Sequence, residues 1–198
     1  KEHSSNVLGV AVDSNGNVYT ASGDKTIKKI DPKGQTVWTN TDHTKADEGV
    51  AVDKDGNVYT ASGDETVKKI DPQGNTVWTN DHTDRVFGVA VDNEGYVYSA
   101  SIDGKVKKIT PNGNTFDTFN VDDDYTQSVA VSPVTDSGTQ YVAAGTGFTN
   151  DRVYRWTQSP VPTGLSQPDW NNNDHSNLVR RTAVDKDGNV YTASFDDT

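Results

Sequence analysis

Residues 49–80 read GVAVDKDGNVYTASGDETVKKIDPQGNTVWTN, and this pattern returns along the 198-residue chain. Near-identical copies begin at Gly9 and Gly88, a diverged copy begins at Ser128, and a partial copy begins at Arg181. The intervals between the five starts are 40, 39, 40 and 53 residues. Periods of this length are typical of repeat architectures, in which each copy is one supersecondary unit packed on its neighbours.

Each copy predicts four short β-strands. In residues 49–80 these are GVAVD, NVYTAS, TVKKID and TVWTN, which are rich in β-branched and aromatic residues and show no helical periodicity. Asp, Gly, Asn and Pro separate the strands, and these residues favour tight turns. Four strands in about 40 residues is the signature of a propeller blade. We therefore expect an all-β fold, a β-propeller of four-stranded antiparallel blades, with blades at residues 9–48, 49–87, 88–127, 128–180 and, in part, 181–198.

The final copy stops just before its third strand. Asp197 and Thr198 match Lys25 and Thr26, so one hairpin of third and fourth strands in a five-bladed ring is absent from this sequence. An open sheet edge invites pairing with another strand. Three explanations stay open: the hairpin lies outside these residues, the chain is part of a larger ring, or another subunit supplies the hairpin. The expected state is therefore a monomer or a strand-completing oligomer.

All four histidines occur at one position of the repeat, and each precedes a Ser by 19 residues and an Asp by 21. This pattern resembles the WD-repeat β-propeller family, with Asp-His or Glu-His in place of its Gly-His pair. Quinoprotein-like and NHL-like propellers share the GVAVDxxGNVY segment. The resemblance implies a structural hydrogen-bond network, in which the His bonds the turn Asp and the Ser supports both. Its members are His3, Ser22 and Asp24; His43, Ser62 and Asp64; His82, Ser101 and Asp103; and His175, Ser194 and Asp196.

A recurring His, Ser and Asp also suggests a hydrolase, but a catalytic triad occurs once per site and not once per blade. We therefore expect no catalytic residue, and we expect no cofactor. Residues 53–57 and 185–189 resemble fragments of a Ca²⁺ loop, yet they lack the distal Glu and further ligands of a complete loop. They predict hairpin turns and no metal site.

Candidate ligand contacts lie in the loops of one propeller face. The fourth copy carries insertions at residues 145–150 and 159–169, and insertions of this kind either carry function or are neutral. The candidate binding residues are Arg85, Tyr125, Phe148 and Asn150.

The charge excludes some partners. A net charge of −11 disfavours nucleic acid and anionic lipid, since both attract cationic surfaces. The chain has no Cys, and no segment approaches the length of apolar sequence that spans a membrane. We therefore expect a non-enzymatic binding module for a protein or a glycan, without nucleic-acid or membrane contact. Two alternatives stay open: a structural or adhesive part of an extracellular or viral assembly in a halophile, and a glycosidase with paired carboxylates in the central channel.

The acid content predicts a dependence on salt. The 29 acidic residues are almost all Asp, as in proteins of halophiles, where concentrated salt screens self-repulsion. The compartment stays open between the cytoplasm and an extracellular or virion setting of a halophilic organism. We expect a higher free energy of unfolding in molar salt than at low salt. Equal values in urea titrations at the two salt concentrations would contradict this.

Overall fold

The structure is a computed structural model that describes residues 2–121, 125–147, 151–158, 164 and 167–195. Its strands form five antiparallel sheets, four of them four-stranded and the last two-stranded. The first sheet contains β1 (Val7–Val12), β2 (Val18–Ser22), β3 (Ile27–Ile30) and β4 (Thr36–Asn40); the second contains β5 (Asp47–Val52), β6 (Val58–Ser62), β7 (Thr66–Ile70) and β8 (Thr76–Asp81); the third contains β9 (Val86–Val91), β10 (Val97–Ser101), β11 (Lys105–Ile109) and β12 (Thr115–Asn120); the fourth contains β13 (Tyr125–Val131), β14 (Gln140–Gly147), β15 (Val153–Gln158) and β16 (Trp170–Asn172); the fifth contains β17 (Val179–Val184) and β18 (Val190–Ser194).

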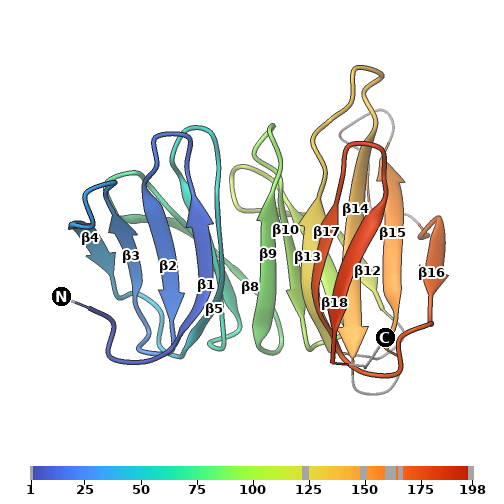
Figure 1. Ribbon diagram of the computed structural model, residues 1–198, viewed down its shortest axis with the longest axis horizontal. Coiled ribbons are helices and arrows are strands. Elements are labelled where there is room, and N and C mark those ends of the chain that lie inside the picture. Colours follow the sequence, from blue (N-terminus) through green and yellow to red (C-terminus); the bar gives the residue numbers. More distant parts are fainter. Residues whose placement is uncertain (1, 122–124, 148–150, 159–163, 165–166, 196–198) are drawn as a thin grey trace.

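Each sheet pairs its strands in chain order (Figure 1). The predicted all-β fold of four-stranded antiparallel sheets is confirmed. In the fourth sheet, β16 is only three residues long, and it pairs with β15 through Trp170 to Asn172. The described part of the chain contains no helix long and apolar enough to cross a membrane.

The first hairpin turn of each blade is built from its own side chains. In the second blade, Asp53 Oδ1 accepts hydrogen bonds from the backbone N–H groups of Asp55 and Asn57, both at 2.9 Å. Gly56 takes a φ of +81°, which glycine adopts without steric cost. Asp53 Oδ2 accepts from the Asn57 amide and the Tyr59 hydroxyl. These carboxylates therefore serve the turn, and no group of three His, Asp or Glu residues in the described ranges could hold a metal ion.

The core lies between successive sheets. Tyr19, Ala21 and Ile27 of the first sheet form one buried cluster with Val58 and Ile70 of the second. A second cluster repeats this arrangement between the second and third sheets, and a third lies between the third and fourth. The second and third sheets therefore bury both faces, because each packs on a neighbour at either side.

Inner strands pack at close range where glycine removes the side chain. A Cβ atom added to Gly49 on β5 would lie 2.8 Å from the backbone oxygen of Phe87 on β9, which is closer than real Cβ atoms come. Glycine at this position of β5 is therefore a packing requirement of its contact with β9.

Candidate functional site

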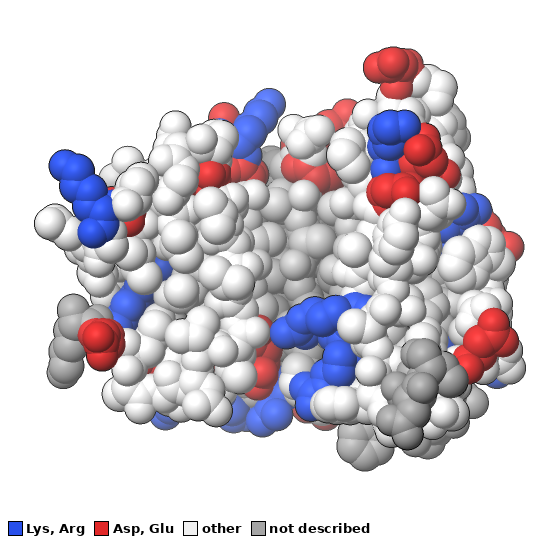
Figure 2. Space-filling view, in the orientation of Figure 1, with Lys and Arg blue, Asp and Glu red and all other residues white. Residues whose placement is uncertain are grey.

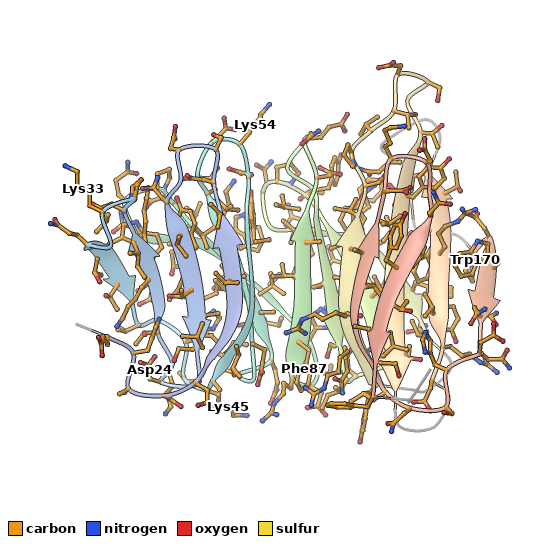
Figure 3. All side chains as sticks on the ribbon, viewed as in Figure 1. Asp24, Lys33, Lys45, Lys54, Phe87 and Trp170 are labelled. Carbon is orange, nitrogen blue, oxygen red and sulfur yellow. The ribbon has the colours of Figure 1, made fainter. Side chains whose placement is uncertain are left out.

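The recurring histidines lie at one end of the molecule, in the loops that lead into the inner strands. Figure 3 places Asp24 and Lys45 at the lower end, with Lys33 and Lys54 at the upper end. In the third blade, His82 Nδ1 lies 3.1 Å from Asp103 Oδ2, and His82 Nε2 lies 2.8 Å from Ser99 Oγ. The structure therefore brings the predicted His and Asp together.

The same geometry recurs in the first two blades. The Nδ1 atoms of His3 and His43 lie 3.1 Å and 3.0 Å from the nearer carboxylate oxygens of Asp24 and Asp64. His175 Nε2 lies 2.8 Å from Thr192 Oγ1, and Asp196 is outside the described residues. Three further hydroxyls lie at the Nε2 side of the other histidines, those of Thr20, Thr60 and Ser99.

Sequence reasoning missed this second partner. In each blade that has a His, a Thr or Ser stands 17 residues after it, and the period alone could have identified that position. The predicted serine has backbone partners instead. Ser101 Oγ donates to the backbone oxygens of Asp84 and Arg85 and accepts from the Asp103 N–H. Ser62 and Ser22 likewise bond backbone atoms.

Hydrogen bonding and burial shift the pKa values of the pair in the third blade. Burial alone would raise the pKa of the Asp103 carboxyl, but interactions with His82, the Thr83 backbone N–H and Lys105 together outweigh it and hold that pKa well below its ordinary range. Burial lowers the pKa of His82, although Asp103 opposes this. His82 and Asp103 thus form a buried polar contact in which each residue shifts the pKa of the other.

A second feature lies at the same end, where the five inner strands surround one cavity. Its volume is about 230 Å³, and each of the five sheets contributes lining residues. Figure 2 shows the surface hollowed between the first and last sheets, with Lys and Arg side chains gathered below the hollow. We call the lower rim of this cavity the channel mouth. Its residues are Leu8, Glu48, Arg85, Phe87, Gln127, Arg180 and Arg181.

Each inner strand carries a β-bulge at the channel mouth. Strand register shifts between Val7 and Gly9, Asp47 and Gly49, Val86 and Gly88, Thr126 and Ser128, and Val179 and Arg181. The extra residue is therefore at the same repeat position in all five sheets. A bulge redirects a side chain out of the regular pleat, and bulges are common beside functional sites. The five bulge residues are Leu8, Glu48, Phe87, Gln127 and Arg180.

The channel mouth is cationic within an acidic protein. Three of the five arginines of the chain, Arg85, Arg180 and Arg181, lie here. Arg85 Nη1 lies 3.9 Å from Glu48 Oε1, and its guanidinium group is 5.5 Å from the centre of the Phe87 ring. Burial raises the pKa of Glu48, and the charges of the three arginines partly offset this.

Arg181 joins the last sheet to the first. It stands where β1, β5 and β9 have glycine, opposite Ala193 in the register that Gly9 shares with Ala21. Its Nη2 donates a hydrogen bond to the backbone oxygen of Leu8 at 3.4 Å. A long side chain therefore occupies this junction, where the other inner strands meet backbone to backbone.

Of the four predicted binding residues, the structure places Arg85 at the channel mouth. Tyr125 begins β13, two residues before the bulge residue Gln127, and its side chain is exposed. Phe148 and Asn150 lie outside the described residues. Sequence reasoning missed Glu48, Phe87 and the Arg180–Arg181 pair. The signal that could have identified these residues is that the bulge position varies between copies of a repeat that is otherwise almost unchanged.

Comparisons with known proteins agree with this fold. A solved chain in the "Crystal Structure of Mitotic Checkpoint Complex" superposes with a TM-score of 0.78 at 18% identity, over 93% of this chain and 58% of that chain. The protein thus spans little more than half the length of that chain, and the likeness shows a propeller fold. The comparison with curated proteins found no significant match.

Two family profiles match the sequence. The WD domain, G-beta repeat, matches residues 1–31. The profile described as outer membrane protein assembly factor BamB matches residues 23–197, nearly the whole chain. The resemblance to WD-repeat and quinoprotein-like propellers is therefore confirmed, and the chain belongs to the propeller family described as outer membrane protein assembly factor BamB.

Proposed function

We propose that the protein is a non-catalytic binding module that recognises a partner protein through the channel mouth. The observation that carries this is the ring of five bulge residues, one from each sheet, with five different side chains. Aliphatic, acidic, aromatic, amide and basic groups stand at a single repeat position. The fold does not require this variety, because the segment that follows is GVAV in three copies and SVAV in a fourth.

The chemistry of the channel mouth favours an acidic peptide segment that contains an apolar residue. Arginine binds carboxylates through paired hydrogen bonds, and Arg85, Arg180 and Arg181 are all exposed. Phe87 and Leu8 offer apolar surface beside them. The matching family is described as an outer membrane protein assembly factor. Binding of a partner protein fits a function in protein assembly.

A glycosidase needs two carboxyl groups placed on either side of the bond that breaks. Among the described residues that line the cavity, Glu48 is the one carboxylate. A hydroxyl does lie at the Nε2 side of each histidine, but those of Thr60 and Ser99 are fully buried, and the arrangement recurs from blade to blade, whereas a catalytic triad occurs once per site. Binding therefore accounts for the channel mouth better than hydrolysis does.

Peptide selection tests the proposal. A random peptide library is selected on the immobilised protein, and the peptides obtained are titrated against Phe87→Ala and Arg85→Ala. We expect the peptides to be rich in Asp and Glu next to an apolar residue, and each variant to weaken binding by about tenfold or more. Lys54→Ala, at the opposite end of the molecule, is the matched control and should leave affinity unchanged. Peptides that bind the Phe87 and Arg85 variants as tightly as the native chain would refute the proposal.

A further inference from the structure

The second and third blades carry the same pair of tyrosine and lysine side chains on their middle strands. Tyr59 on β6 lies opposite Lys69 on β7, and Tyr98 on β10 lies opposite Lys108 on β11. In each pair the lysine Nζ lies over the tyrosine ring, 5.5 Å from its centre in the second blade and 5.4 Å in the third. The two blades therefore offer a hydroxyl and an ammonium group in the same arrangement.

Two carboxamides of the fourth blade occupy the place beside the Tyr98 and Lys108 pair. Gln140 on β14 and Gln158 on β15 are opposite each other in the register, and both are fully buried. Their Oε1 atoms each lie 3.1 Å from the Tyr98 hydroxyl, and Lys108 Nζ donates a hydrogen bond to Gln158 Oε1 at 2.7 Å. Gln140 Nε2 donates to the backbone oxygen of Ser132 at 3.2 Å. Within this fold, a carboxamide is therefore the group that the tyrosine and lysine pair binds.

The equivalent pair of the second blade lies beside a cavity. This cavity, between the second and third blades, has a volume of about 380 Å³ and is lined by Tyr59 and Lys69. The Lys69 side chain is partly exposed, and its Nζ has no hydrogen-bond or ion-pair partner in the part of the chain that the structure describes. Lys108, by contrast, is fully buried. The second blade thus presents the same binding groups to an open cavity.

The strand register explains why this cavity is open. In the fourth blade, Gln140 and Gln158 lie two residues beyond the cross-strand pair that adjoins the end of the inner strand. In the third blade, Gly95 and Pro111 stand at the matching positions, and both line the cavity. Neither residue carries a carboxamide, so the space that two glutamines fill at one junction is unfilled at the other. The matching cross-strand pairs are Val142 with Trp156 and Val97 with Ile109.

The charges around the cavity favour a neutral polar ligand. Four carboxylates and two ammonium groups line it. The carboxylates oppose an anion, and the Lys69 ammonium beside the Tyr59 ring opposes a cation. A carboxamide is neutral, accepts hydrogen bonds through its oxygen and donates two through its nitrogen. The charged residues are Asp53, Asp55, Asp92, Glu94, Lys54 and Lys69.

We propose that the cavity between the second and third blades binds glutamine or asparagine side chains of a partner protein. The carboxamide oxygen accepts a hydrogen bond from Lys69 Nζ, next to the Tyr59 hydroxyl. Gln158 and Lys108 are the template for this bond. The carboxamide nitrogen donates to a carboxylate of the turn at residues 92–95. A protein is the expected source of the carboxamide, because the occupants of the next junction are side chains of a polypeptide.

This site is separate from the channel mouth. Lys54, which lines the cavity, lies at the upper end of the molecule in Figure 3, whereas Phe87 of the channel mouth lies at the lower end. Loss of binding at one site is therefore expected to leave binding at the other unchanged.

Nuclear magnetic resonance titration of the isotope-labelled chain tests this. The probe is N-acetylglutamine N-methylamide. The comparison compound is N-acetylmethionine N-methylamide, which has a similar length and no carboxamide on its side chain. We expect saturable shifts of the backbone N–H signals of Lys69 and residues 93–95, with a Kd of about 1 mM for a ligand of this size. The methionine compound should bind at least about tenfold more weakly, because it leaves the ammonium group without an acceptor.

Variants of the chain locate the binding. Lys69→Met removes the ammonium group, keeps the length of the side chain and should weaken the probe by at least about tenfold. Tyr59→Phe removes only the hydroxyl and should also weaken it. Lys33→Met is the matched control, since Lys33 is an exposed lysine at the same end of the molecule, and it should leave the affinity unchanged. The signals of the other blades report that each variant is folded.

Equal binding of the two compounds would overturn the proposal, and so would an unchanged affinity in Lys69→Met. Tighter binding of N-acetylglutamate N-methylamide would assign the cavity to an anion, and acetamide that binds as tightly as the probe would assign it to a free amide. Either result would also overturn the proposal. Arg85→Ala, at the channel mouth, should not change the affinity, so failure at this cavity is distinguishable from failure at the channel mouth.

Discussion

Replacing Asp47 with valine is expected to raise the free energy of unfolding by about 2–4 kcal/mol at pH 8, since an isolated buried carboxylate is costly. Asp47 is fully buried, and neither of its carboxyl oxygens has a hydrogen-bond partner. It pairs with Ser62 in the register where Val7, Val86 and Val179 pair with Ser22, Ser101 and Ser194. Valine therefore suits the position, and three other blades already carry it.

The gain from Asp47→Val should depend on pH. Burial raises the pKa of Asp47 from 3.8 to about 8, although the nearby Ser62 hydroxyl opposes this shift, and His43 Nε2 lies 3.6 Å from Asp47 Oδ1. The unfolded chain releases this proton near pH 4, but the folded chain holds it until about pH 8. A raised carboxyl pKa thus costs stability progressively as pH rises through this window. The variant should gain least at pH 4 and most above pH 8.

Urea unfolding of both proteins at pH 5 and pH 8 provides the measurement. Asp47→Asn is the informative companion, because it removes the charge and keeps a buried polar group. It should lose the same pH dependence while gaining less stability than valine. A valine variant that is less stable than the native chain at pH 8 would show that the carboxylate has a favourable partner, and the account of this position would be wrong.

Replacing His82 with alanine is expected to lower the free energy of unfolding by about 1–3 kcal/mol, the cost of leaving a buried partner unsatisfied. The change removes the hydrogen-bond partner that His82 provides to Asp103 and to the Ser99 hydroxyl. His175→Ala is the matched control. The pair of His175 and Thr192 lies in an exposed setting, so its loss should cost clearly less.

Acid should reduce the difference between native and His82→Ala proteins. The pKa of His82 is lowered in the fold, so the unfolded chain takes up a proton first as pH falls below about 6.5, and the native protein loses stability. The alanine variant lacks this loss. The depressed pKa of Asp103 adds a second loss near pH 4. Thermal unfolding at pH 7.5 and pH 5 measures the effect, and a difference that grows in acid would contradict it.

The fold could be predicted because the same strand pattern recurs in five copies of the repeat, the last of them partial. The spacing of Gly9, Gly49 and Gly88 set the period, and turn residues such as Asp53 and Gly56 divided the strands where the structure divides them. The His and Asp positions could be predicted for the same reason. Their Thr and Ser hydroxyl partners were missed because a hydroxyl inside a strand carries no local signal, and only the comparison between copies shows it.

The channel mouth could not be predicted from single strands. Phe87 and Glu48 precede a strand-like GVAV segment and look like ordinary strand residues. Their special place depends on the bulge, which is a property of the register between two strands. The burial of Asp47 could not be predicted for a related reason. In the sequence, Asp47 and Glu48 resemble a solvated acidic pair, and only the strand pairing of Asp47 with Ser62 puts Asp47 in the core.

Amide hydrogen exchange with a selected peptide tests whether a partner binds at the channel mouth. We expect slower exchange in residues 86–89 and 179–182, where β9 and β17 carry their bulges. Residues 53–57 and 71–75, in the turns at the opposite end, should exchange at an unchanged rate. Protection confined to those turns, with none at the mouth, would contradict the account.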